Sequence, residues 1–164
     1  MRTAVAAFNS GLVSWRADWA WGVPLIVLTV VIHVLALGLL DERGVRVFSR
    51  HTERRDPLLE FVAMMGITTV YATVLHAFEA GMWAALYQFL GALPDFKTAM
   101  LYSISAITSY GHENLLLQSH WQLLGAIEAL NGCLLFGLTT AFLFGMIQKV
   151  WSLSKDGRAR GNGN

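Results

Sequence analysis

The sequence predicts an all-α membrane protein with three membrane-spanning helices and one short re-entrant pore helix. Of the 164 residues, 55% are hydrophobic and only 14% are charged, whereas a soluble domain carries about 25% charged residues. The mean hydropathy is +0.49. Several long apolar runs with so few charges leave little polar surface to face water, so we expect most of the chain to lie in lipid.

The net charge and the cysteine content exclude some classes of function. The formal net charge is +1, and no basic cluster suggests a nucleic-acid partner. The single cysteine, Cys133, cannot form a disulfide within the chain, and its apolar surroundings favour a buried packing role. Residues 1–20 lack the pattern of a secretory signal and are interpreted as a short lead-in outside the membrane.

The first span is predicted from Trp21 to Leu40, a run of about 20 uncharged residues that is long enough for a bilayer core. Pro24 falls in its expected first turn, where a missing N–H is harmless. His33 is the titratable residue inside this span, and we expect it to be packed or hydrogen-bonded. Residues 21–56 then comprise this additional helix and an arginine-rich loop.

The second span begins after Asp56, with Pro57 at its first position. A rise of about 28 Å from Pro57 places His76 near the far membrane face. We therefore expect residues 80–93 to emerge into the interface. Three aromatic residues are the expected anchors there: Trp83, Tyr87 and Phe89.

A short helix is predicted over residues 96–108, with Asp95 as its N-cap. About 13 residues cannot cross a bilayer but suit a re-entrant helix. A polar string follows at residues 109–114, and the third span runs from Trp121 to about Val150. The pore domain therefore covers residues 57–151, and residues 152–164 are expected to form a disordered cytoplasmic tail.

Basic residues predict the orientation. Five arginines follow the first span, at positions 43, 46, 50, 54 and 55, and four basic residues flank the C-terminal end of the third span. The other side of the predicted topology holds Arg2, Arg16 and Lys97. The positive-inside rule puts the arginine-rich loop and the C-terminus in the cytoplasm and the N-terminus outside, in a bacterial inner membrane.

The order of helix, polar string and glycine-bearing span indicates a pore. Non-helical backbone at membrane depth is tolerated inside protein or along a water-filled path. A chain of this size cannot surround residues 109–114, but several copies around an axis can, so we expect a homotetramer. The C-terminal end of the re-entrant helix carries partial negative charge, which favours a cation.

These residues resemble the pore module of bacterial potassium channels, a family with two transmembrane helices around a pore helix. Residues 96–147 are similar to its pore helix, filter and inner helix, and residues 136–141 (FGLTTA) resemble its inner-helix segment. Residues 76–96 are similar to the outer-helix end and turret. Ser103 and Thr108 match the serine and threonine before the filter, and Gly111 matches its first glycine.

The predicted filter departs from that family. Where the family has tyrosine, glycine and aspartate after the first glycine, this chain has His112, Glu113 and Asn114. A potassium filter aims successive carbonyls at the ion, and a side chain at the second glycine would be strained. We therefore expect one or two oxygen sites from Thr108, Ser109, Tyr110 and Gly111. Monovalent cations, potassium or sodium, are the expected ions, divalent cations are the alternative, and selectivity for potassium is not expected.

Three carboxylates and three histidines enter the prediction. A ring of Glu113 side chains would concentrate cations, with His112 as a pH-sensitive neighbour, unless both turn into the protein. Glu128 is expected to hold the re-entrant loop from behind, and His76 is expected to pair with Glu79 or with the loop. A metal site is the sharper alternative. Its candidate ligands are His76, Glu79, His112, Glu113, His120 and Glu128.

The inner helix carries the remaining candidates. Gly132 and Gly137 suit close packing or a hinge. The resemblance implies that Thr140 and Phe144 face the axis, where a ring of Phe144 would gate by dewetting. Altogether the sequence predicts a cation channel without enzyme activity, cofactor or resident metal. The alternatives are a non-conducting channel relative and a membrane-embedded metalloenzyme.

Overall fold

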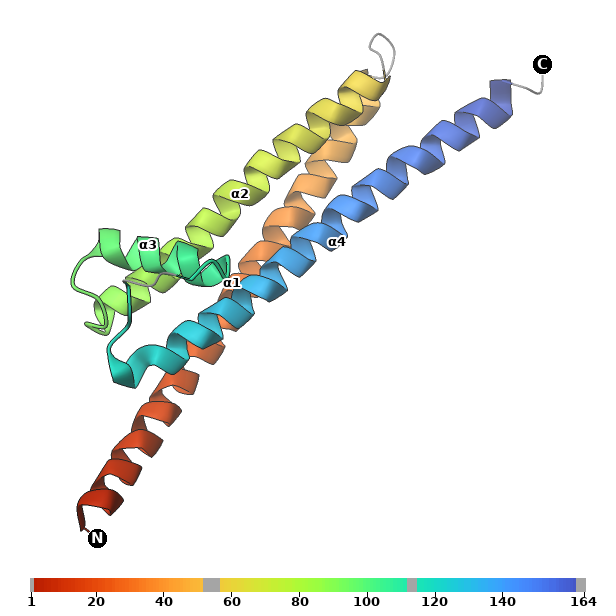
Figure 1. The fold of residues 1–164 in the computed structure, drawn as a ribbon. Helices are drawn as coiled ribbons and strands as arrows, with labels where there is room; N and C mark the ends of the chain where they lie inside the picture. The colour runs from red at the N-terminus through yellow and green to blue at the C-terminus, as the bar shows by residue number, and fades with distance from the viewer. Residues whose placement is uncertain (1, 52–56, 112–114, 162–164) are drawn as a thin grey trace. The chain divides into compact units, whose positions relative to one another are not determined.

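The computed structural model describes residues 2–51, 57–111 and 115–161, and it describes side chains at 15–40, 59, 61–111 and 115–148. All regular structure in this part of the chain is helical (Figure 1). The elements are α1 (Arg2–His51), α2 (Pro57–Phe89), α3 (Phe96–Ile107), the 3-10 turn η1 (Ser119–Trp121) and α4 (Gln122–Gly161).

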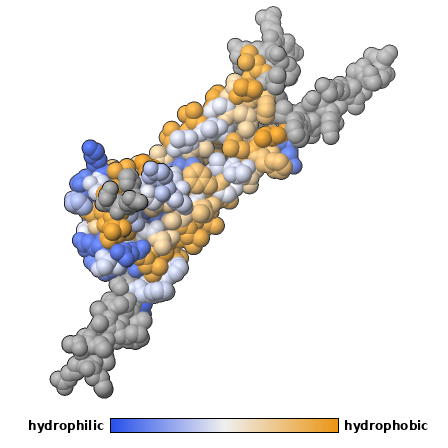
Figure 2. All heavy atoms as spheres, in the orientation of Figure 1, coloured by the Kyte–Doolittle hydropathy of each residue, from blue (hydrophilic) through white to orange (hydrophobic). Residues whose placement is uncertain are grey.

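Three of these helices contain segments long and apolar enough to cross a bilayer. The segments are Trp15–Leu40 in α1, Phe61–Phe89 in α2, and Ser119–Gln148, which joins η1 to α4. Figure 2 shows that apolar side chains, in orange, cover much of the visible surface along them. The predicted all-α architecture is confirmed for the described residues, and so is the prediction of three helices long and apolar enough to span a membrane.

Helices α1 and α4 extend past the predicted ends of their spans. Because α1 begins at Arg2, Pro24 lies inside the helix and not in its first turn, so the prediction for Pro24 was wrong. Helix α1 also continues to His51, through much of the predicted loop. Likewise α4 reaches Gly161, where a disordered tail was predicted. The point where the sequence stops being apolar shows where a bilayer could end. It does not show where the helix ends, because charged residues such as Arg and Lys still favour helix.

The chain divides into two compact units, Met1–His33 with Leu75–Leu135, and Val34–Val74 with Phe136–Asn164. The first unit contains α3 and a core built from α2, α3 and α4, with residues of α1 packed against it. In the second unit, the Tyr71 hydroxyl donates to the Ala36 carbonyl at 3.2 Å, and the Thr68 hydroxyl donates to Met146 Sδ at 3.7 Å.

The end of α2 is the centre of the first unit. Trp83 and Tyr87 are fully buried there, so their predicted role as interfacial anchors was wrong. Phe89 is 75% exposed and remains available for that role. The reason is that α3 folds back onto α2, as the edge-to-face contact of Tyr87 with Tyr102 at 5.3 Å shows. Distance along α2 alone predicted that this segment emerges into the interface, although its side chains form part of the core.

Helix α3 has the predicted start and a well-defined cap. Asp95 Oδ1 accepts the Thr98 N–H at 3.0 Å, and Asp95 Oδ2 accepts the Thr98 hydroxyl at 2.7 Å, which confirms Asp95 as the N-cap. The Thr98 backbone hydrogen bond, followed by that of the Thr98 side chain, lowers the pKa of Asp95. This cap fixes where the chain turns from the end of α2 into α3.

Helices α2 and α3 end in the same hydrogen-bond pattern. The Ala92 N–H donates to Tyr87 at the end of α2, and the Tyr110 N–H donates to Ser105 at the end of α3, both at 2.9 Å. This pattern requires a left-handed residue, and Gly91 supplies it after α2 with φ 66°. Ser109 takes that position after α3 with φ 55°, a conformation that costs a residue with a side chain about 1 kcal/mol or more.

The C-terminal end of α3 abuts α4 at a glycine. A Cβ atom added to Gly132 would lie 2.0 Å from the Ile107 carbonyl oxygen and 2.8 Å from Ile107 Cα. Ile107 and Leu135 belong to one buried cluster at this approach. Because the contacting atoms are backbone, they cannot move aside as a side chain would. Gly132 is therefore a close-packing residue that lets α3 reach α4.

We predict that Gly132→Ala destabilises the protein by about 2–3 kcal/mol, because the added methyl group must push α3 away from α4. Thermal unfolding of the purified protein in detergent measures the effect. Gly137→Ala is the matched control, since nothing lies within 4 Å of a Cβ atom there. Equal melting temperatures for the two variants would show that the α3–α4 approach is not tight.

Candidate functional site

The side chain of Glu128 joins α4 to both α2 and α3. It is fully buried, and its Oε2 accepts the Tyr87 hydroxyl of α2 at 2.6 Å. Its Oε1 is in hydrogen-bond contact with the Ser103 hydroxyl of α3. The expected role of Glu128 was to hold the re-entrant segment from behind. In the structure its partner is the body of α3, four residues before the helix ends.

The number of hydrogens available at Ser103 indicates whether the Glu128 carboxyl is neutral or charged. The Ser103 hydroxyl carries one hydrogen, yet two oxygens lie within reach, the Ala80 carbonyl at 2.7 Å and Glu128 Oε1. A neutral Glu128 carboxyl supplies the second hydrogen, so that Ser103 donates to Ala80 and accepts from Glu128. A neutral carboxyl also avoids an unpaired charge among fully buried groups.

These contacts place the end of α3 deep among the spans. Ala80 lies nine residues, or roughly 14 Å, before the end of the segment Phe61–Phe89. Gly132 lies 13 residues, or roughly 20 Å, after the start of the segment Ser119–Gln148. Because Ser103 contacts Ala80 and Ile107 contacts Gly132, the short helix ends near the middles of two candidate spans.

The predicted filter segment follows directly and faces outward. Ser109, Tyr110 and Gly111 are all exposed in the single chain, Tyr110 by 78%. Positive φ angles occur at Ser109 and Gly111 but not at the intervening Tyr110. Thr108 is the C-cap of α3, and its hydroxyl donates back to the Ile104 carbonyl at 2.7 Å. His112, Glu113 and Asn114 lie outside the described residues.

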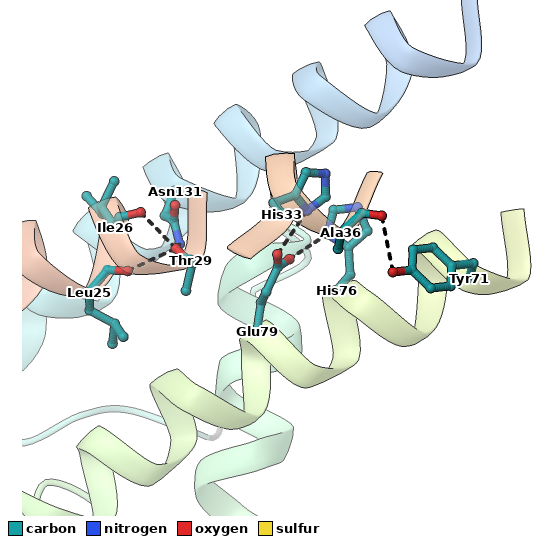
Figure 3. Close-up of polar contacts among 9 residues, drawn as sticks. All are labelled: Leu25, Ile26, Thr29, His33, Ala36, Tyr71, His76, Glu79 and Asn131. Carbon is teal, nitrogen blue, oxygen red and sulfur yellow. Dashed lines mark hydrogen bonds and ion pairs between the residues drawn. The ribbon is translucent and has the colours of Figure 1, made fainter. Parts of the chain in front are cut away.

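A second buried polar cluster connects α1 to α2. Glu79 is fully buried, its Oε1 lies 2.9 Å from His33 Nδ1, and its Oε2 lies 3.3 Å from His76 Nδ1 (Figure 3). The predicted pairing of His76 with Glu79 is present. His33 was expected to be packed or hydrogen-bonded, but its convergence with this pair was missed. One turn along α1, buried Thr29 accepts a hydrogen bond from Asn131 of α4 at 2.9 Å.

The metal set proposed from the sequence is not assembled among the described residues. Within the described part of this set, only His76 and Glu79 lie together, and His33 completes their group. Glu128 contacts Tyr87 and Ser103 instead. His120 is exposed on η1. No single sequence motif could have brought in His33, because it lies 46 residues from Glu79 on another helix.

The inner-helix candidates are divided between the units. Gly132 packs against α3 in the first unit, whereas nothing lies near a Cβ atom at Gly137. In the second unit, Thr140 and Phe144 are exposed on α4, and the Thr140 hydroxyl donates to the Phe136 carbonyl at 2.8 Å. Their exposure leaves them available for contacts with other molecules or with lipid. Cys133 of α4 is also exposed, so the expectation that it is buried was wrong.

Comparisons with models of protein families, with curated proteins and with solved structures find no match. Function is therefore inferred from the residues and their geometry.

We predict that Glu128→Gln folds with nearly normal stability, whereas Glu128→Ala loses about 2–4 kcal/mol. The glutamine amide can donate to Ser103 and its carbonyl can accept from Tyr87, as a neutral carboxyl does. Alanine leaves both buried hydroxyls without this partner. Thermal unfolding of the three proteins in detergent is the measurement, and a severe loss in the glutamine variant would contradict a neutral Glu128.

Proposed function

We propose that this chain is a subunit of a homotetrameric cation channel. Its pore module resembles that of bacterial potassium channels and has an altered filter. The observation that carries the proposal is the position of Ser109, Tyr110 and Gly111. They form exposed, non-helical backbone directly after a 12-residue helix that ends near the middles of two candidate spans.

Lipid is an unsuitable neighbour for that segment. In hydrocarbon, each backbone N–H or carbonyl without a partner costs several kcal/mol, so irregular backbone at this depth must face protein or water. The first unit of one chain leaves the segment exposed. Further copies around an axis would cover its flanks and enclose a wet path, as closed symmetry readily provides. Four copies are the number that the potassium-channel resemblance implies.

A cation is the favoured ion on three grounds. The C-terminal end of α3 carries partial negative charge at the base of the segment. Carbonyl oxygens after the helix cap are ligands for alkali cations, and left-handed φ angles on both sides of Tyr110 resemble an alternating filter backbone. Glu113 would add four carboxylates at the outer mouth. The passage of potassium or sodium with altered selectivity is the function that these features support.

Helix α1 would be an addition to the two-helix pore unit. Its polar contacts, Thr29 with Asn131 and His33 with Glu79, attach it to α4 and α2 within the first unit. The proposed orientation places the N-terminus outside and the arginine-rich end of α1 in the cytoplasm of a bacterial cell, on the basis of the positive-inside rule. The filter segment would then enter from outside.

We predict that the purified protein in liposomes conducts potassium or sodium above the level of empty vesicles. We expect Glu113→Gln to lower cation flux roughly 2- to 10-fold at low ionic strength, because it removes charge that concentrates cations. Asp95→Asn is the matched control, since it removes one exposed carboxylate per chain while asparagine still caps α3.

Three outcomes would count against parts of this proposal or all of it. Absence of flux from a protein that native mass spectrometry shows to be tetrameric would favour a non-conducting channel relative. Unchanged flux in Glu113→Gln would contradict the acidic ring but would not contradict the pore. A monomer in mild detergent and in nanodiscs would contradict the channel itself, because one chain cannot enclose the segment.

A further inference from the structure

Three metal-ligating side chains from two helices meet in the interior of the first unit. His33 comes from α1, and His76 and Glu79 come from one face of α2, three residues apart (Figure 3). One ligand atom from each of the three side chains lies within 4.8 Å of the other two. His33 and Glu79 are fully buried, and the side chain of His76 is 12% exposed.

The spacing of these atoms is close to that of a tetrahedral ion site. Zinc binds histidine nitrogen and carboxylate oxygen at about 2.0–2.2 Å, which places ligand atoms of a tetrahedral site roughly 3.3 Å apart. His33 Nδ1 lies 2.9 Å from one oxygen of Glu79, and His76 Nδ1 lies 3.3 Å from the other. The centroids of the two imidazole rings are 5.1 Å apart, and the ring planes are tilted by 35° to one another. Because the ligand atoms of the three side chains lie within 4.8 Å of one another, a small rearrangement of these side chains would bring one ion into contact with all three.

The chemistry of the set selects the class of ion. Two imidazoles and one carboxylate suit borderline transition metals such as Zn²⁺, whereas Ca²⁺ and Mg²⁺ prefer sites made of oxygen. The carboxylate is also a charge buried among apolar helices, which is costly unless a positive partner accompanies it. A divalent ion would supply that partner without a proton on either imidazole.

Neighbouring contacts hold α1 and α2 in place beside the cluster before an ion binds. Thr29, one turn before His33, is tied to Asn131 of α4, and its hydroxyl also donates to the Leu25 carbonyl at 3.0 Å. Ala80, next to Glu79, is fully buried and its carbonyl is held by Ser103. Both helices are therefore fixed close to the cluster, which lowers the entropic cost of assembling ligands.

We propose that His33, His76 and Glu79 bind one Zn²⁺ ion per chain and that this ion joins α1 to α2. Three protein ligands leave the fourth tetrahedral position for water. The site is separate from the filter segment, so it goes beyond the proposed channel function and does not depend on conduction. Its direct effect is to anchor the additional helix, because His33 is the ligand from α1.

The experiment uses the full chain, purified in detergent, stripped with a chelator, incubated with Zn²⁺ and desalted. Elemental analysis should find close to one zinc per chain in the wild type. Glu79→Gln and His33→Gln should each weaken zinc binding at least ~10-fold. His120→Gln is the matched control, because it removes an exposed histidine outside the cluster and should leave zinc content unchanged.

Two further measurements keep the proposal testable if one of these variants fails to fold. Wild-type protein loaded with Co²⁺ should show the visible absorption of tetrahedral cobalt, and added Zn²⁺ should abolish it. His76→Gln replaces the partly exposed ligand and should behave like the other two cluster variants. The proposal is overturned if the wild type retains no zinc. It is also overturned if His120→Gln removes the metal, or if the cluster variants retain it.

Discussion

The buried carboxyl of Glu128 is the contact on which the arrangement of the first unit depends. It lies on α4, accepts from Tyr87 of α2 and contacts Ser103 of α3, so one side chain joins three helices. Such a group is costly in an apolar interior unless every oxygen has a partner. Both of its oxygens have these partners only when α3 packs against α2 and α4 at this point. This requirement selects one position for a helix too short to cross a bilayer.

The position of α3 then determines the course of the chain beyond it. With Ser103 fixed, the helix runs on to Ile107 and stops against Gly132, where only a glycine allows the backbones to approach. The chain must turn there, and it does so through a left-handed serine. The polar backbone that emerges is exposed in the single chain. Enclosure by further copies is then expected from the cost of placing that backbone in lipid.

The sequence predicted the elements that depend on local signals. The number of long apolar helices, the N-cap Asp95 and the start of the third apolar segment near Trp121 follow from hydropathy and capping chemistry, and the structure confirms them. The intramembrane carboxylates Glu79 and Glu128 stood out because charges are rare in apolar runs. For Glu79 the sequence offered His76 as one partner, which the structure shows, but it did not identify His33 or the partners of Glu128.

The errors concern contacts between distant segments. Trp83 and Tyr87 look like interfacial anchors by distance along α2, and only the return of α3 buries them. His33 joins Glu79 across 46 residues, a separation at which no periodicity within one helix can help. The length of α1 was misjudged for another reason, since hydropathy reports the preferred solvent of a segment and not where its helix ends.

The central claim is that several copies bring the segment after α3 to a shared axis. The most direct measurement is the distance between spin labels on different copies, placed by Tyr110→Cys in a chain that carries Cys133→Ser. In lipid nanodiscs, a fourfold arrangement predicts two distances in a ratio of about 1.4 to 1, for adjacent and diagonal copies. Absence of any dipolar signal between copies would contradict the account.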